Sequence, residues 1–321
     1  MTEEAGSARS NLSGFLTGEF LHEHGEETPL LTGDAAFQPH ISSMGNASGY
    51  GAVRPAPTVP MDDASQHVWP EMCTLAKFTV PICATHLLEL SLSVVSVLSL
   101  GHLGTVELAS ASLAGITANV TGFSVISGLV SALDTLLPAS YTRQPHLMGL
   151  WTQRVGLMVF AVLPLIFVLW LNAERGLILL GQDPDIAYNA RQFLMVLSFG
   201  LPGVAIFELC RRFLQAQGMM HAPTVVLIIV SPLNAVANFF LVWGPERYRI
   251  GFLGAPMASA LSMWLMAALC AVQCAVACRD TWGGFSRDVW DPAALRTCVS
   301  LGFAGLISLA SEWWAWEIVG L

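Results

Sequence analysis

The amino-acid sequence predicts an all-α polytopic membrane protein, and three observations lead to this fold class. Of the 321 residues, 54% are apolar and only 12% are charged, about half the charged fraction of an ordinary soluble domain. Apolar windows of roughly 20 residues, the length that crosses a bilayer, recur along the chain. Turn-forming residues separate these windows. The seven windows lie at residues 76–99, 107–131, 153–171, 192–209, 222–243, 252–277 and 297–321.

Glycine and proline set the end of each predicted helix in turn. Glycine tolerates left-handed turns, and proline lacks the backbone N–H that continues a helix. These residues occur between all consecutive windows, so each window is expected to form a separate helix. The six breaks are Gly101–Gly104, Pro138–Pro145, Gly181–Pro184, Gln217–Gly218, Gly244–Pro245 and Trp282–Gly284.

The charge balance and the absence of common motifs exclude several classes of function. A net charge of −9 would repel a nucleic-acid backbone. The sequence contains no ATP-binding Gly-x-x-x-x-Gly-Lys, no metalloprotease HExxH and no Ser/His/Asp pattern, so we expect neither an enzyme nor a bound cofactor. His22 and His24 lack a third ligand and a scaffold, so no metal site is expected.

Charge and composition divide the chain into three parts. Residues 1–70 hold nine acidic and two basic residues and are rich in Gly, Ser, Thr and Pro, which predicts a disordered acidic tail. Residues 71–280 are predicted to form a bundle of six membrane helices. Residues 281–321 form a linker and a seventh helix. That helix reaches Leu321 without a polar cap, which indicates a truncated chain.

Arginines in the connections predict the orientation in the membrane. The even-numbered connections hold seven arginines and the odd-numbered ones hold four, which places the even connections and the N-terminus in the cytoplasm. In a cytoplasmic tail, Glu26, Leu30 and Leu31 have the form of an acidic dileucine signal for a sorting adaptor. We therefore expect a vacuolar or plasma-membrane location.

Glu89 and Glu208 fall inside predicted helices, where a charge is costly and needs a reason. Glu89 lies in the first helix with His86 three residues before it, so the pair could share a proton. Alternatively, Glu89 hydrogen-bonds a nearby serine or a neighbouring helix and only fixes the packing. Glu208 precedes Arg211 and Arg212 by three and four residues, which predicts a salt bridge within the helix.

The seventh helix combines two acids with tryptophans. Glu312 has Trp316 four residues after it, and Glu317 has Trp313 four residues before it, so each acid has an indole on its own side of the helix. A carboxylate beside indole rings suits an organic cation. Because a carboxylate also takes up a proton, protons and cations could compete for the site. An interfacial tryptophan belt is the alternative.

Five short motifs follow these windows in a fixed order. With them the sequence resembles the multidrug and toxic compound extrusion (MATE) family, most of all its fungal branch, over residues 73–321. The motifs are Gly101-His-Leu-Gly104, Ala132-Leu-Asp134-Thr135, Gly181-Gln-Asp-Pro184, Arg211-Arg-Phe-Leu-Gln215-Ala-Gln217-Gly218, and Glu312-Trp-Trp with Glu317.

The resemblance implies two six-helix lobes with a substrate cavity between them. This chain would supply the N-lobe and the first helix of the C-lobe. Glu312 and Glu317 match the acids that couple cation and proton in eukaryotic members, and the glycines and polar motif residues listed above have structural roles. Bacterial members carry an aspartate shortly before the first motif, whereas residues 93–100 here hold no acid.

The sequence therefore predicts a secondary-active exporter that exchanges an organic cation or other xenobiotic for protons by alternating access. Two alternatives remain. The truncated chain could be a transport-inactive half-transporter, or the helix count could reflect a seven-helix receptor. A receptor needs an external N-terminus, on which the sequons at Asn11 and Asn46 would be glycosylated.

Overall fold

The computed structural model describes the backbone of residues 61–247 and 249–320, and the side chains of these residues outside 61–68, 280 and 316–320. The sorting motif at Glu26, Leu30 and Leu31 lies outside the described residues. The elements are α2 (Met61–Gly101), α3 (Thr105–Ala118), η2 (Asn119–Phe123), α4 (Ser124–Val130), α5 (Ala132–Arg143), η3 (Pro145–Leu147), α6 (Met148–Leu171), α7 (Ala173–Leu179), α8 (Pro184–Ser198), α9 (Leu201–Gln215), α10 (His221–Asn238), η4 (Phe239–Trp243), η5 (Gly251–Leu253), α11 (Gly254–Ala277), α12 (Arg279–Trp282), η6 (Arg287–Trp290) and α13 (Pro292–Gly320).

The helices confirm the predicted fold class. In the described part of the chain, six segments are long and apolar enough to cross a membrane, and there are seven if a bent pair of helices counts as one span. Each of the seven predicted windows overlaps one of them. The segments are Trp69–Gly101, Thr105–Arg143, Pro145–Leu171, His221–Trp243, Gly251–Ala277 and Pro292–Ala315, and the bent pair is Pro184–Ser198 with Leu201–Gln215.

The fourth span is bent by 51° between α8 and α9. Gly200 lies at the bend, and a Cβ added there would lie 2.5 Å from the sulfur of Met263 and 3.0 Å from the Cα of Ala260 on α11. The missing side chain therefore lets α11 pack directly against the bend. Pro202 follows in the first turn of α9, a position where its missing N–H is harmless.

The second span is longer than its predicted window, because helical structure continues from Thr105 to Arg143. The helix ends inside the predicted break Pro138–Pro145, although Pro138 itself lies within α5. It ends at Gln144, whose φ is −147°. The following Pro145 explains this end, since a proline disfavours helical geometry in the residue before it.

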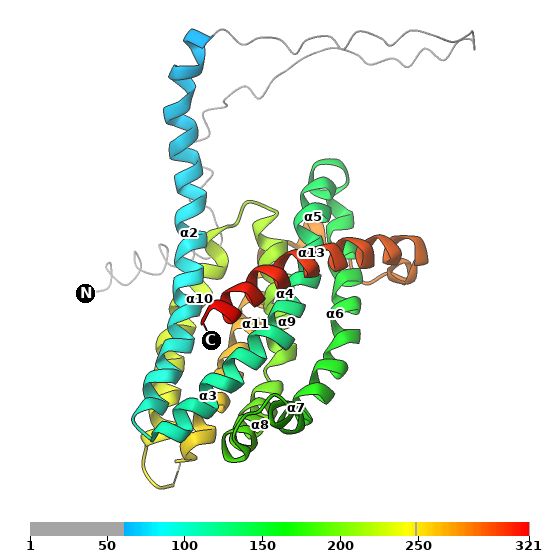
Figure 1. Cartoon of the computed structure of the whole chain (residues 1–321). Coiled ribbons are helices and arrows are strands. Elements are labelled where there is room, and N and C mark those ends of the chain that lie inside the picture. The colour runs from blue at the N-terminus through cyan, green and yellow to red at the C-terminus, as the bar shows by residue number, and fades with distance from the viewer. Residues whose placement is uncertain (1–60, 248, 321) are drawn as a thin grey trace, which may run out of the picture. The chain divides into compact units, whose positions relative to one another are not determined.

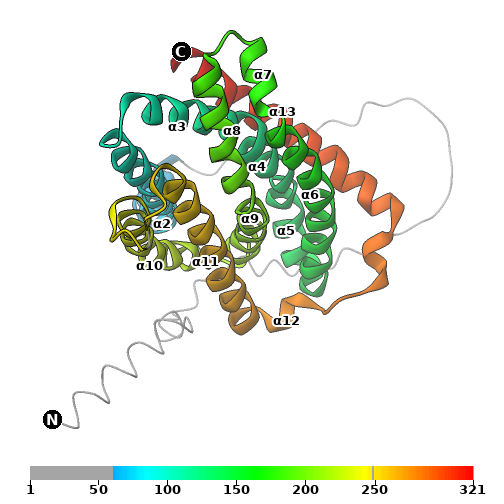
Figure 2. The ribbon, with the colours of Figure 1, turned by 90° about the horizontal axis from the view of Figure 1, so that it is seen from below.

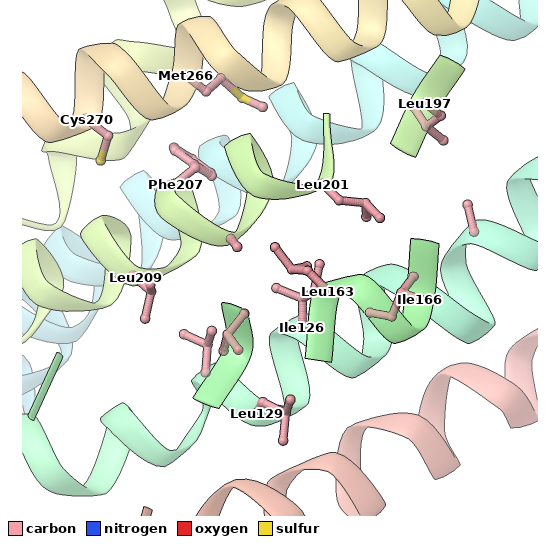
Figure 3. Packing of buried hydrophobic residues seen from close by; sticks show 14 of the residues in the cluster. Ile126, Leu129, Leu163, Ile166, Leu197, Leu201, Phe207, Leu209, Met266 and Cys270 are labelled. Atoms are coloured by element: carbon pink, nitrogen blue, oxygen red, sulfur yellow. The ribbon is translucent and has the colours of Figure 1, made fainter. Parts of the chain in front are cut away.

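Buried apolar side chains from several spans form the core of the unit Leu75–Leu321. Figure 3 shows Ile126 of α4, Leu163 and Ile166 of α6, and Leu201 of α9 pointing toward one another. Trp170 and Phe213 are the largest side chains buried completely or nearly so. In lipid, such close packing holds helices together in place of the hydrophobic effect.

Glycines bring α13 onto α4. A Cβ added to Gly128 would lie 2.6 Å from the Cα of Leu306, and one added to Gly305 would lie 2.8 Å from the carbonyl oxygen of Gly128. Figures 1 and 2 show α13 in red alongside α4 and α6. Small residues at a helix crossing allow backbones to approach in a membrane, so this crossing fixes the seventh span against the second.

Candidate functional site

A cavity of about 620 Å³ lies among the membrane spans. Its walls come from α2, α3, α8, α9, α10 and α11, and Trp313 of α13 also contributes. Three of the residues predicted to bind substrate or protons, His86, Glu89 and Trp313, line this one cavity, and so does the motif residue Arg211. The helices thus bring together residues more than 200 positions apart in the sequence.

A chain of ion pairs occupies the wall formed by α2 and α9. Arg211 donates from Nη1 to Glu89 at 2.9 Å and from Nη2 to Glu208 at 2.7 Å. Nδ1 of His86 lies 3.1 Å from the second oxygen of Glu89. The side chains of Arg211 and Glu208 are 9% and 8% exposed. A buried guanidinium between two carboxylates satisfies the charges that burial would otherwise penalise.

This geometry refines the interpretation of the two intramembrane acids. The salt bridge predicted for Glu208 is confirmed, with Arg212 as a second, longer contact at 3.9 Å. Glu89 contacts both His86 and Arg211 of the neighbouring helix α9, so both kinds of partner considered from the sequence are present. The pair of Glu89 with Arg211 could not be predicted from local spacing, because the two residues are 122 positions apart.

Hydroxyl and amide groups from three spans add hydrogen bonds at the cavity and beside it. Asn234 donates to Ser262 at 2.9 Å, Asn238 donates to Ser96 at 3.4 Å, and the hydroxyls of Ser96 and Ser259 are 3.4 Å apart. Because lipid offers no hydrogen bonds, these groups pair across α2, α10 and α11. Polar residues inside apolar windows were the signal in the sequence that could have identified them.

The described residues of the seventh span have different surroundings. Trp313 lines the cavity, whereas Glu312 is exposed. The indole N–H of Trp314 donates to the carbonyl oxygen of Val120 at 3.2 Å, in the π-helical segment η2. The side chains of Trp316 and Glu317 lie outside the described residues.

The remaining motif residues hold turns and link helices. Gly101 ends α2, and Gly104 precedes α3, where a Cβ would lie 2.2 Å from the Glu107 carboxylate. Asp134 forms an ion pair with Arg212. Gln215 ends α9, and Gly218 has a φ of +81°, which favours glycine. Their positions fit structural roles. No described cluster of three or more His, Cys, Asp or Glu side chains could hold a metal ion.

The chain is similar to known transporters. The MatE family model matches residues 81–240. An uncharacterized transporter of Schizosaccharomyces pombe, C4B3.13, is 39% identical over 82% of this chain and 48% of its own length. Multidrug and toxin extrusion protein 2 of Mus musculus is 33% identical over 77% of this chain and 43% of its own length.

Among solved structures, the eukaryotic MATE transporter AtDTX14 superposes with a TM-score of 0.73. It is 27% identical and covers 78% of this chain, which in turn covers 56% of AtDTX14. The chain spans about half the length of the curated relatives it matches.

Proposed function

The chain belongs to the MATE family of transporters, and from this premise we propose that it forms the N-terminal part of a secondary-active exporter. The exporter exchanges an organic cation or other xenobiotic for protons, and alternating access moves the substrate through the membrane. The toxin extrusion named for the mouse relative supports a substrate of this kind.

The charge of the cavity is the observation that carries this proposal. Among its described lining residues, two carboxylates (Glu89 and Glu208) face one guanidinium (Arg211), so the lining has a net charge of −1 when His86 is neutral. Phe123, Phe207 and other aromatic rings line the same space. A negative and aromatic cavity attracts a cation with an apolar body through both charge and cation–π contact.

We assign the coupling of cation and proton to Glu312 and Glu317, the acids that match the family motif, with Trp313 and Trp316 as aromatic partners. Glu89 and His86 form a second candidate proton site. The ion pair between Glu89 and Arg211 means that a substrate cation at Glu89 competes with a guanidinium. We therefore prefer the acids of the seventh span to Glu89 and His86 as the coupling site.

Proton-driven uptake of a fluorescent organic cation into proteoliposomes tests the assignment. We expect Glu312→Gln to abolish uptake while membrane insertion stays normal. Glu174→Gln is the matched control, because Glu174 pairs with Arg191 at a half-exposed site away from the cavity. Normal uptake by the Glu312 variant would remove that acid from the mechanism. A chain that binds the cation but does not transport it would support the transport-inactive alternative.

We further propose a vacuolar or plasma-membrane location with a cytoplasmic N-terminus, and a sorting adaptor that binds Glu26, Leu30 and Leu31. Replacing both leucines with alanine is expected to move a fluorescently tagged chain to another membrane. An unchanged location would contradict the adaptor. A glycan on Asn11 or Asn46 would contradict the orientation, whereas membership of the MATE family already excludes the seven-helix receptor.

A further inference from the structure

A second hollow, which the proposed transport function does not use, lies on the other side of α9. This groove has a volume of about 920 Å³, and its walls come from α6, α9 and α11. Figure 2 shows α9 between α6 and α11, with α12 beside the end of α11. Residues of α12 and of the segment that follows it cover one end of the groove.

The groove walls are almost entirely apolar. Side chains such as Leu157, Phe160, Ile206 and Phe213 line them, and Leu157 and Phe160 belong to a membrane-spanning segment. An occupant therefore enters from the hydrocarbon of the bilayer rather than from water. Acyl chains are the apolar molecules at highest concentration there, so the walls fit an acyl chain.

The covered end of the groove is preformed. The carbonyl oxygen of Trp282 approaches α6 so closely that a Cβ on Gly149 would lie 1.9 Å from it. Gln153 donates to the carbonyl oxygen of Gly284 at 2.8 Å, and the ring of Trp282 meets that of Phe213 edge-on at 5.8 Å. These contacts hold the segment over the groove without an occupant.

This covered end has the chemistry of a membrane interface. Phe285 and Trp290 line the groove there and are 87% and 67% exposed, as aromatic rings at the level of lipid headgroups are. Arg279 also lines it and is exposed. Its Nε donates to the carbonyl oxygen of Ala275 at 3.0 Å, and no hydrogen bond or ion pair of its Nη atoms is found among the described side chains.

We propose that this groove binds one anionic phospholipid, with an acyl chain between α6, α9 and α11 and the phosphate at Arg279. A guanidinium binds phosphate oxygens through two parallel hydrogen bonds. In the orientation that the arginine distribution predicts, this end faces the cytoplasm, whose leaflet carries the anionic lipids. The proposal is independent of the transported substrate.

Native mass spectrometry of the delipidated 321-residue chain tests this site with dioleoyl phosphatidylglycerol and dioleoyl phosphatidylcholine as probes. We expect one phosphatidylglycerol per chain. Its affinity should exceed that of zwitterionic phosphatidylcholine by about fivefold, the factor expected for one arginine beside a headgroup of net negative charge. Arg279→Gln should remove this preference. Arg296→Gln is the matched control. Arg296 is exposed on α13, and its substitution removes the same charge outside the groove lining.

A second variant tests the acyl-chain part. Ala275 lines the groove and is exposed, so Ala275→Phe should reduce binding of both lipids while the melting temperature stays near that of the unchanged chain. Equal affinity for the two lipids, or equal effects of the two arginine variants, would overturn the proposal. So would a dimer without bound lipid, because a second copy would then fill the groove.

Discussion

The two faces of α9 line two hollows of opposite character. Phe207, Glu208 and Arg211 face the cavity with its ion pairs, whereas Ile206, Leu209 and Phe213 face the apolar groove. Within each set, residues recur at spacings of three and four, which places them on one face of a helix. One short helix therefore divides a polar interior from a lipid-like exterior, and substitutions on its two faces should have different consequences.

The largest expected effect comes from removing the shared cation on the cavity face. Arg211→Leu removes the guanidinium that Glu89 and Glu208 share and should destabilise the protein by about 3–5 kcal/mol, the usual cost of breaking a buried ion pair. Thermal unfolding in detergent measures the loss. Arg191→Leu, which removes a half-exposed pair with Glu174, should cost about 1 kcal/mol or less. Equal losses of stability for the two variants would show that the buried network contributes no more to stability than the half-exposed pair.

The thiol of Cys278, which lines the groove, gives a pH-dependent prediction. Burial raises the pKa of Cys278, which follows the span Gly251–Ala277, from 9.0 to about 11. The reactive thiolate is then about a hundredfold scarcer near neutral pH than for a thiol of pKa 9. Maleimide labelling of Cys278 should therefore rise about tenfold for each pH unit up to about 10. Mass spectrometry of labelled peptides measures it, with exposed Cys73 as reference, and a flat profile would contradict this shift.

Separating α13 from α4 should alter the cavity and spare the groove, because Trp313 reaches the cavity from α13. In Gly305→Val, the added side chain meets Ser131 and the backbone of Gly128, and overpacking of this kind costs about 1–3 kcal/mol. Cation binding to the chain should weaken, whereas phosphatidylglycerol binding should not change. A parallel loss of both would show that the two hollows are coupled. Gly176→Val, at a site with open space around the glycine and outside the lining of both hollows, is the control.

The smallest expected effect concerns the hydrogen bonds between spans. Asn234→Leu removes the bond to Ser262, and such bonds in membranes contribute about 0.6 kcal/mol on average. The melting temperature should fall slightly. Adding Ser262→Ala to the Asn234→Leu variant should lower the melting temperature almost no further, since the hydrogen-bond partner of Ser262 is already lost. Additive losses would show that the two side chains act separately.

The sequence predicted the spans well because length and apolar composition alone decide whether a helix crosses a bilayer. It also predicted the salt bridge of Glu208, whose partner is three residues away. The pair of Glu89 with Arg211 and the bonds of Asn234 join different helices, and no local spacing encodes such contacts. The groove was not predicted for the same reason. Residues 279–290 cover one end of it and contact α6, which is distant in the sequence. The roles of Glu312 and Glu317 stay predictions.

The π-helical segment η2 (Asn119–Phe123) has a consequence for comparing and redesigning this span. A π-helical turn holds one more residue than an α-helical turn, and one residue corresponds to about 100° of rotation. The residues before and after η2 are therefore out of phase for a continuous α-helix. Deleting one residue within η2 would restore a continuous α-helix and leave Ser127 facing the cavity that it lines together with Ser112. An alignment of this span with one that lacks a π-helical turn needs a one-residue gap at η2. Without that gap, inward-facing residues of one span would be matched with outward-facing residues of the other.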